Sequence, residues 1–472
     1  MTDAARGALR AWAARAAVAA LALGIPLSPV PDGLTPPAWY LFAIFAATIV
    51  AVVLNVLPIL TASVLAVAAA VLTGTLSPDQ AYSGFANATI LLIVVAFLVA
   101  RAVVKCGLGQ RIGYAVVSVF GRSTLGLSYS VFLVDGVIAP AFPSNTARAG
   151  VLYPLAFSLA EAAGATPGDA SRRRLGAFLM FSGMASLSVS SALWLTAMAA
   201  NPLGAEIARP FGVDIGFGSW LVAASVPTLA AMLVLPLLLY KLVAPEVTAT
   251  PNAPAEAKRA LAARGPLTRD EKVVTAVFIA MVALWALSAP LGLDSTAIAF
   301  LGLGALLVSR VLTLDDIAAQ GDVLAIYLWF AVLFTLSSQL NELGFMGFIG
   351  QKLALALAGV PTAAAAVVLL VSYVALHYLF VSQTAHLLAV FGVFLDVGVR
   401  LGVAPATLAF QMLFATNYFS VIAPQGSSAN LLFAGSGYMT QGEMYRIGAI
   451  CTAVSLLVYV VIGVPWLWLV TR

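Results

Sequence analysis

Apolar runs of about 20 residues recur along the whole length of this 472-residue chain. A helical run of that length spans the roughly 30 Å hydrocarbon core of a bilayer. No water reaches that core, so the backbone groups must bond to one another within helices. Charged residues make up only 9% of the chain, whereas a soluble domain carries about 25%. The sequence therefore predicts an all-α polytopic membrane protein and excludes a soluble enzyme.

Proline, glycine and charged residues lie at the ends of the apolar runs. These boundaries predict about 11 transmembrane helices. The spans are predicted near residues 12–28, 38–57, 59–75, 88–105, 175–200, 217–243, 272–290, 295–309, 322–340, 406–433 and 445–469. Two further apolar stretches, about 124–163 and 362–399, are each interrupted by small and polar residues. These two are predicted to be re-entrant hairpins, which enter the membrane and return on the same side.

The basic residues orient this map. With the N-terminus in the cytoplasm, 17 Lys and Arg residues fall inside and only four outside: Arg209, Lys352, Arg400 and Arg472. The positive-inside rule supports that orientation. We therefore expect a bacterial-type inner (plasma) membrane protein with a cytoplasmic linker at 244–271, a cytoplasmic-side first hairpin, a periplasmic-side second hairpin and a periplasmic C-terminus. The net charge of +4 then reflects this bias, and no nucleic-acid partner is expected.

Matching segments in the two halves indicate a duplication. Three pairs recur in order at offsets of 236, 237 and 238 residues: 76–79 with 312–315, Gly107 with Gly344, and 144–147 with 382–385. The predicted spans place the copies in opposite orientations, an architecture typical of secondary transporters. After an N-terminal helix within 1–37, the repeats would cover 38–243 and 272–472. Small-residue clusters also recur wherever membrane helices pack, which is the alternative explanation.

The hairpin interruptions are candidate anion sites. One carries Ser144, Asn145 and Thr146, and the other carries Ser382, Gln383 and Thr384. A helix that begins at such a tip offers unpaired N–H groups and the positive end of its dipole. Two tips from opposite sides of the membrane would each hold one end of a small dicarboxylate. Helix capping without a ligand is the simpler reading of either tip alone.

Each tip serine is followed four residues later by a basic side chain, Arg148 or His386. An ionisable group at membrane depth is costly and marks a functional position. A fixed cation there would neutralise the anionic substrate or stand where a coupling cation would bind. The alternatives are an ion pair between Arg148 and Asp135 and a neutral, hydrogen-bonded His386. We expect His377 to be structural.

Two further polar stretches are predicted to complete the site. The first contains Ser190 and Ser191 and continues to Asn201. The second runs from Asn417 to Asn430 and contains Pro424, Gly426 and Ser427. Because proline removes a backbone donor, a helix cannot continue undisturbed through the second stretch. Unwound backbone is tolerated at membrane depth only where protein buries it or where it lines a cavity.

These motifs resemble those of the divalent anion/sodium symporters, the INDY family. The match is closest to its exchanger branch of plastid 2-oxoglutarate/malate translocators and bacterial citrate/succinate antiporters, on the runs 143–150, 195–202, 377–386 and 435–438. The resemblance covers nearly the whole chain. It implies an INDY-type elevator fold, a homodimer in the lipid bilayer, and a moving transport domain that holds both hairpins.

The second tip departs from the sodium-coupled pattern, because Gln383 replaces asparagine and His386 follows it. We therefore expect sodium-independent exchange of C4/C5 dicarboxylates such as 2-oxoglutarate, malate and succinate, with no cofactor. Arg148 and His386 would compensate charge in place of a coupling cation.

The main alternative is a sodium-coupled dicarboxylate or sulfate symporter. Sodium would then bind near Ser144, Asn145, Ser382 and Gln383. A channel and an intramembrane enzyme are further alternatives. The two histidines lack the spacing of a zinc protease motif, so no metal ligand set and no catalytic residue is predicted.

Overall fold

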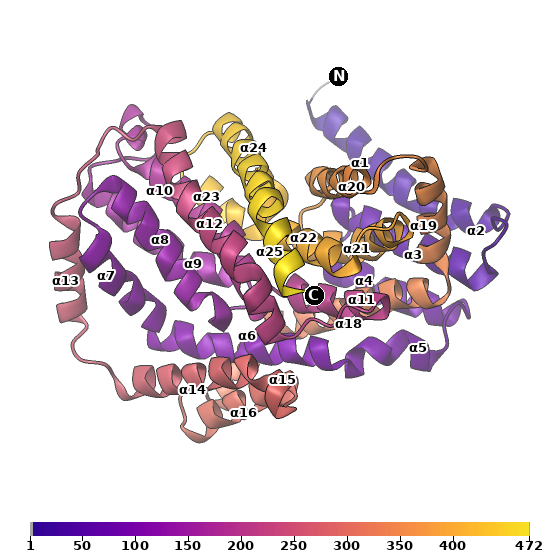
Figure 1. The fold of residues 1–472 in the computed structure, drawn as a ribbon, viewed down its shortest axis with the longest axis horizontal. Helices are drawn as coiled ribbons and strands as arrows, with labels where there is room; N and C mark the ends of the chain where they lie inside the picture. Colours follow the sequence, from indigo (N-terminus) through magenta and orange to yellow (C-terminus); the bar gives the residue numbers. More distant parts are fainter. Residues whose placement is uncertain (1–2, 472) are drawn as a thin grey trace.

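The computed structural model describes residues 3–471, which fold into helices joined by loops, with one isolated bridge between Ser123 and Ala249. Figure 1 shows α8 and α9 on one side of the molecule and α20 and α21 on the other. Residue Arg472, which the charge distribution places outside, lies beyond the described range.

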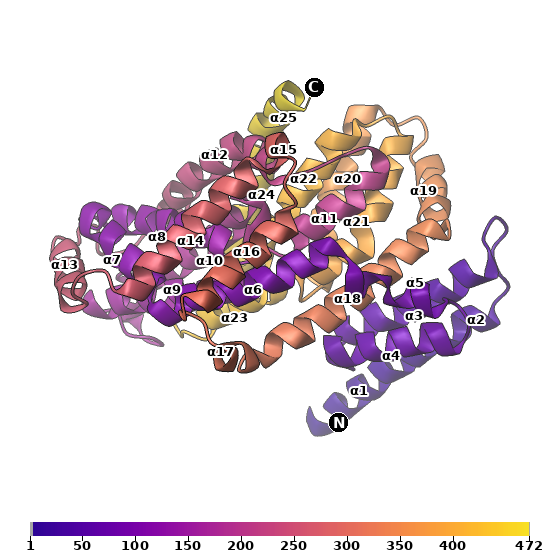
Figure 2. The same cartoon turned by 90° about the horizontal axis from the view of Figure 1, so that it is seen from below.

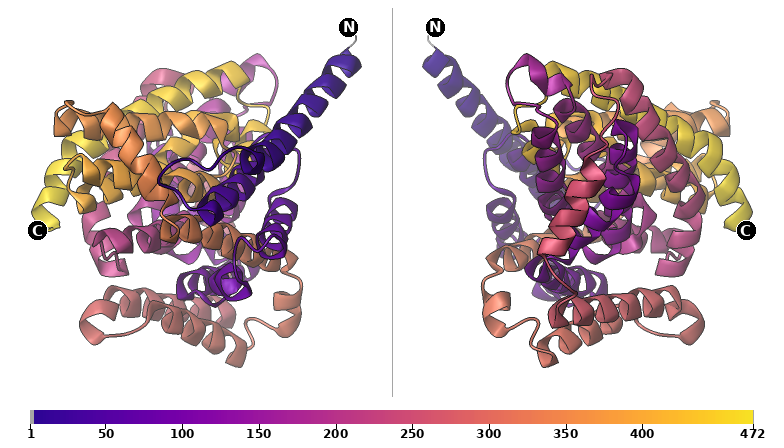
Figure 3. Two further views of the ribbon diagram at one scale, coloured as in Figure 1. Left: turned by 90° about the vertical axis from the view of Figure 1, so that its right-hand side faces the viewer. Right: turned by 90° about the vertical axis from the view of Figure 1, so that its left-hand side faces the viewer.

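The N-terminal segment forms one nearly continuous rod. It consists of α1 (Asp3–Ala19), a π-helical turn (Ala20–Gly24) and α2 (Ile25–Leu27). Figure 3 shows α1 extending away from the body of the molecule. Most of the described side chains of this rod are exposed and many are apolar, as is typical of a helix that faces lipid.

The helices of the two halves follow one order. The first half contains α3 (Pro36–Val53), α4 (Ile59–Leu72), α5 (Pro78–Tyr82), α6 (Ala88–Cys106), α7 (Leu108–Phe120), α8 (Thr124–Ile138), α9 (Asn145–Ala162), α10 (Gly176–Leu193), α11 (Ala200–Ala208) and α12 (Phe217–Val243). The second contains α14 (Arg269–Ala286), α15 (Ser288–Leu291), α16 (Ser295–Val308), α17 (Leu314–Ala318), α18 (Gly321–Glu342), α19 (Phe345–Ala356), α20 (Thr362–Leu376), α21 (Gln383–Arg400), α22 (Pro405–Tyr418), α23 (Ser428–Ala434), α24 (Gln441–Val458) and α25 (Val464–Val470).

The matched sequence segments have matched structures. Ser77 and Thr313 each cap a five-residue helix through a capping box with the residue three positions on. Gly107 and Gly344 are both left-handed, with φ of 74° and 83°, and each starts the helix that precedes a hairpin. Since a left-handed turn favours glycine, the two glycines end one helix and redirect the chain in the same way. A duplication predicts such matched pairs, and the two inverted repeats stay a prediction.

The all-helical membrane fold is confirmed. Between residues 3 and 471, eight helical segments are long and apolar enough to cross a bilayer, and two of them are the first arms of the hairpins. Helices α4 and α16 are 14 residues each, shorter than the roughly 20 that a perpendicular span needs. The count of about 11 spans therefore stays a prediction.

Helix α10 forms the centre of the first half. All 18 of its residues are buried, and it packs against α8, α9, α12 and α22. Its glycines allow close approach, because a Cβ at Gly176 or Gly183 would overlap the ring of Tyr438 or Phe433. A helix buried on every side gives the neighbouring hairpin a fixed wall.

The polar linker contains α13 (Ala253–Ala263), which packs along α7. Arg111 of α7 bonds Glu271 through a 2.8 Å contact between Nε and Oε1. Figure 2 shows α14 and α16 beside α6. Through these contacts the linker ties the start of the second half to the first.

Candidate functional site

The two hairpin tips have the same local structure. The α8 arm ends in a 3-10 turn (Ala139–Ala141), and α9 begins after Ser144. The α20 arm ends in a 3-10 turn (His377–Leu379), and α21 begins after Ser382. Each serine is extended and caps its helix, accepting a 3.3 Å bond from the backbone N–H three residues on. Capping uses one donor of each first turn, so others remain directed at the tip.

The tips meet each other. The Nδ2 atom of Asn145 donates to Oε1 of Gln383 over 3.0 Å, and Nε2 of Gln383 donates to the carbonyl of Thr416 over 2.8 Å. Thr146 and Ser428 share a 2.7 Å hydroxyl–hydroxyl bond. The two halves are therefore joined at the positions that the sequence motifs indicate.

Both polar stretches break their helices in the same way. After α10, the Nδ2 atom of Asn201 donates to the carbonyls of Ser191 and Trp194. After α22, the Nδ2 atom of Asn430 donates to the carbonyls of Ser420 and Ala423. Each asparagine thus satisfies two carbonyls that lose their helical partners where the helix ends. The predicted span 406–433 is accordingly two helices, α22 and α23, separated by short 3-10 turns.

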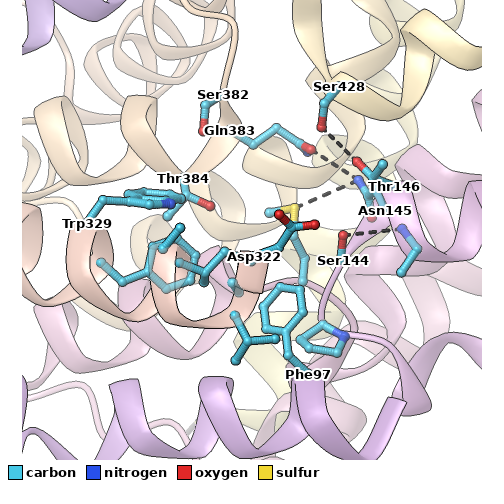
Figure 4. Close-up of a pocket in the computed structure, with 18 of the residues that line it drawn as sticks. Phe97, Ser144, Asn145, Thr146, Asp322, Trp329, Ser382, Gln383, Thr384 and Ser428 are labelled. Atoms are coloured by element: carbon cyan, nitrogen blue, oxygen red, sulfur yellow. Dashed lines mark hydrogen bonds between the residues drawn. The ribbon is translucent and has the colours of Figure 1, made fainter. Parts of the chain in front are cut away.

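A cavity of about 640 Å³ lies between the tips (Figure 4). Its walls come from six parts of the chain: both tips, the start of α18, α6, and the two broken stretches. The lining residues are 143–147, 381–384, Gln320, Asp322, Val323, Ala325, Ile326, Trp329, Phe330, Phe97, Met198, Ala199, Ser427 and Ser428. Hydroxyl, amide and aromatic groups thus surround a space within the size range of small-molecule sites.

Arg148 lies behind the first tip, outside the cavity lining. Its side chain is fully buried, and Nη1 lies 3.1 Å from Oδ1 of Asp135. Nη2 donates to Oδ1 of Asn145 over 2.6 Å, and both Ser190 and Ser191 also bond the guanidinium. The ion pair that was the alternative reading is therefore present. Because Asp135 balances the charge, the contact of Arg148 with the cavity is indirect, through Asn145.

His386 is also buried behind its tip. Rings of Tyr373, His377, Phe380 and Phe419 surround it, and neither of its ring nitrogens has a hydrogen-bond partner within the described residues. His377 bonds the carbonyl of Gly426 over 2.7 Å and stacks on Phe419, which fits the structural role expected of it.

The predicted site residues fall into two groups. Seven line the cavity: Ser144, Asn145, Thr146, Ser382, Gln383, Thr384 and Ser427. Gly426 does not line it, and its carbonyl bonds the buried His377. The others lie behind this layer: Ser190 and Ser191 hold Arg148, and Pro424 begins a turn that leads to Ser427. The sequence therefore identified the tips, but not the distinction between lining and supporting residues.

Sequence reasoning missed the α18 wall. Asp322 and Trp329 line the cavity from α18, and Phe97 does so from α6. Arg101, one turn beyond Phe97, has a buried Nε without a hydrogen-bond partner in the described chain. Two signals were available in the sequence: Asp322 is an acid at the edge of a predicted span, and Arg101 is an arginine inside one.

The amide oxygens that a bound sodium ion would need are already engaged. Oδ1 of Asn145 accepts from Arg148 and from Ser191, and Oε1 of Gln383 accepts from Asn145. Hard cations prefer several oxygen ligands. Both tips would therefore have to exchange internal bonds to hold sodium at the positions named under the sodium-coupled alternative.

Two broken hairpins that meet at one cavity within an all-helical membrane fold form the architecture of the multi-pass secondary transporters. The family described as "Sodium:sulfate symporter transmembrane region" matches residues 9–471. The chain belongs to that family, the divalent anion/sodium symporters that the tip motifs resemble.

Similar proteins cover nearly the whole chain. YflS of Bacillus subtilis (strain 168), whose name proposes malate transport, is 42% identical over 95% of this chain and 94% of its own length. Dicarboxylate transporter 2 of Spinacia oleracea chloroplasts is 38% identical over 93% and 78%. The L-tartrate/succinate antiporter of Shigella sonnei (strain Ss046) is 30% identical over 97% and 98%.

A solved structure shares the fold. The YdaH transporter of Alcanivorax borkumensis superimposes with a TM-score of 0.56 at 16% identity, over 82% of this chain and 87% of that one. At that identity the likeness concerns the fold alone.

Proposed function

We propose that this protein exchanges C4/C5 dicarboxylates across a membrane without sodium, and that the acid binds between the two tips. The supporting observation is the cavity bounded by Ser144, Thr146, Ser382 and Thr384, where two helix N-termini converge. A dicarboxylate presents one anionic group to each terminus, and hydroxyl and backbone donors bind each group. The names of the relatives agree with this substrate class.

The engaged amide oxygens support independence from sodium. Arg148 fills the coordination of the Asn145 oxygen with a covalently attached cation, although Asp135 balances its charge. His386 stands at the matched place in the second half, and there we propose that its ring takes the position of a second cation. In this account Arg148 acts by holding Asn145 in place, and the dipoles of α9 and α21 attract the substrate.

The sodium-coupled symporter remains the second candidate, because the family's description names sodium and sulfate. It shares the fold and the tips, and it differs only in requiring a cation at each tip. A homodimer and elevator movement of the two hairpins belong to the proposal as well, as does the orientation with a cytoplasmic N-terminus.

Counterflow in proteoliposomes tests the proposal. Vesicles loaded with malate or 2-oxoglutarate should take up the labelled acid at equal rates in sodium and in choline buffers. Strict dependence of uptake on a sodium gradient would contradict exchange and favour the symporter. Sulfate in place of the internal acid serves as the control for substrate class.

A further inference from the structure

Asp322 is an acid on the wall of a cavity assigned to an anion. It lies in the first turn of α18 and is exposed. Figure 4 shows its carboxylate in the space between the tips, with Ser144 on one side and Thr384 and Trp329 on the other. Among the described residues that line the cavity, Asp322 is the one with an ionisable side chain.

No nearby base neutralises this carboxylate: within the described residues, the side chain of Asp322 takes part in no hydrogen bond or ion pair. Lys105, at the end of α6, pairs with Asp316 over 2.6 Å, and Arg148 pairs with Asp135. Arg101 of α6 and His386 of α21 are the remaining bases close in sequence to lining residues, and neither bonds Asp322. Arg101 makes no ion pair with it within 4.0 Å, and both ring nitrogens of His386 lack a partner in the described chain. The negative charge therefore acts on whatever occupies the cavity.

Helix stability alone gives a simpler account of Asp322, since an acid in the first turn complements the helix dipole. That effect explains why the fold tolerates an acid there. The carboxylate still repels anions in the cavity, because the side chain of Asp322 is exposed to that space. Each negative charge on a bound acid meets the same repulsion, so the penalty grows with the charge of the substrate.

We propose that Asp322 is a specificity-determining residue that limits the charge of the transported acid, favouring dianions over trianions. This inference rests on the proposed function and adds a charge limit to it. At separations of several ångströms and an effective dielectric constant near 20, one further unit of charge costs on the order of tenfold in affinity. Discrimination by repulsion complements the attractive contacts at the tips, as specificity often requires.

The test compares a tricarboxylate with a dicarboxylate in proteoliposomes. The measured quantity is the ratio of kcat/KM for citrate to kcat/KM for malate at neutral pH. Asp322→Asn removes the charge at nearly constant shape and should raise that ratio about tenfold. Asp322→Glu keeps the charge and should leave the ratio near that of the wild type. Asp315→Asn is the matched control, because Asp315 is exposed on α17 outside the cavity lining.

An unchanged or lower ratio in Asp322→Asn would overturn the inference. If that variant does not fold, the inference is tested by the affinities of the purified wild-type protein for a dicarboxylate and a tricarboxylate. Glutarate and propane-1,2,3-tricarboxylate share a carbon chain and differ by one carboxylate, so glutarate should bind at least tenfold more tightly; equal affinities would overturn the inference. Wild-type protein that moves no dicarboxylate would instead refute the proposed function itself.

Discussion

The side-chain amide of Asn145 donates to the side-chain oxygen of Gln383 over 3.0 Å, although 238 residues separate them in sequence. The two residues are the first of α9 and α21, so this bond joins the two hairpins at their tips. The same asparagine accepts from Arg148, and the glutamine donates to the end of α22. One chain of hydrogen bonds therefore runs from Asp135 through both tips.

Breaking this bond should impair exchange from either side. Asn145→Ala and Gln383→Ala should each lower the counterflow rate at least tenfold, because each leaves a buried partner unpaired. The double variant should be little worse than either single one, with a coupling of about 0.5–3 kcal/mol. Gln441→Ala, an exposed glutamine on α24, is the control. Strictly additive losses would show that the two tips act independently.

Removing Arg148 should destabilise the protein as well as stop exchange. Arg148→Ala leaves the buried Asp135 carboxylate unpaired, at a cost of about 3–5 kcal/mol. Replacing both partners, as Arg148→Met with Asp135→Leu, should recover most of the thermal stability. Exchange should stay absent, because Asn145 still lacks its guanidinium donor. Thermal unfolding and counterflow of the same preparations measure both effects, and an active double variant would contradict this positioning role.

The two matched asparagines should have matched importance. Asn201→Ala and Asn430→Ala each leave two buried carbonyls without a donor, so each should cost about 1–3 kcal/mol of stability. Thermal unfolding in one detergent compares them directly. Thr471→Ala, near the C-terminal end of the described chain, is the control, because the Thr471 hydroxyl bonds only the carbonyl of Leu467 one turn earlier. If one asparagine proves dispensable, the two breaks are not equivalent.

The ion pair between Lys105 and Asp316 should be insensitive to pH near neutrality. The ammonium of Lys105, with help from Thr313, lowers the pKa of Asp316 to about 2. A lowered pKa stabilises the fold above the ordinary value near 4, and that contribution is lost as the pH falls towards 2. The difference in thermal stability between wild type and Asp316→Asn should therefore stay constant from pH 5 to 8. A difference that changes within that interval would contradict the assignment.

Much of the fold follows from local sequence. The lengths of the apolar runs predicted the helices. Ser144 and Ser382 predicted the hairpin tips, because capping and chain reversal depend on neighbouring residues. The break at Pro424 was predictable for the same reason, since proline ends a helix wherever it lies in one.

The remaining features depend on packing between distant helices. Asp322 and Phe97 reach the cavity only because α18 and α6 lie against the tips, and neither residue carries a local motif. Likewise, the sequence offered Asp135 as a partner for Arg148 but left the choice between ion pair and cavity open. Three-dimensional placement made that choice, because Asp135, Ser190 and Asn145 all bond the guanidinium behind the cavity lining.

The central claim is that a dicarboxylate binds between the two hairpin tips. A structure determined by electron cryo-microscopy in saturating malate or 2-oxoglutarate tests it most directly. The account predicts density for the acid within reach of Ser144, Thr146, Ser382 and Thr384, with one carboxylate at the start of α9 and the other at the start of α21. Density for the acid elsewhere in the protein, with the space between the tips empty, would contradict it.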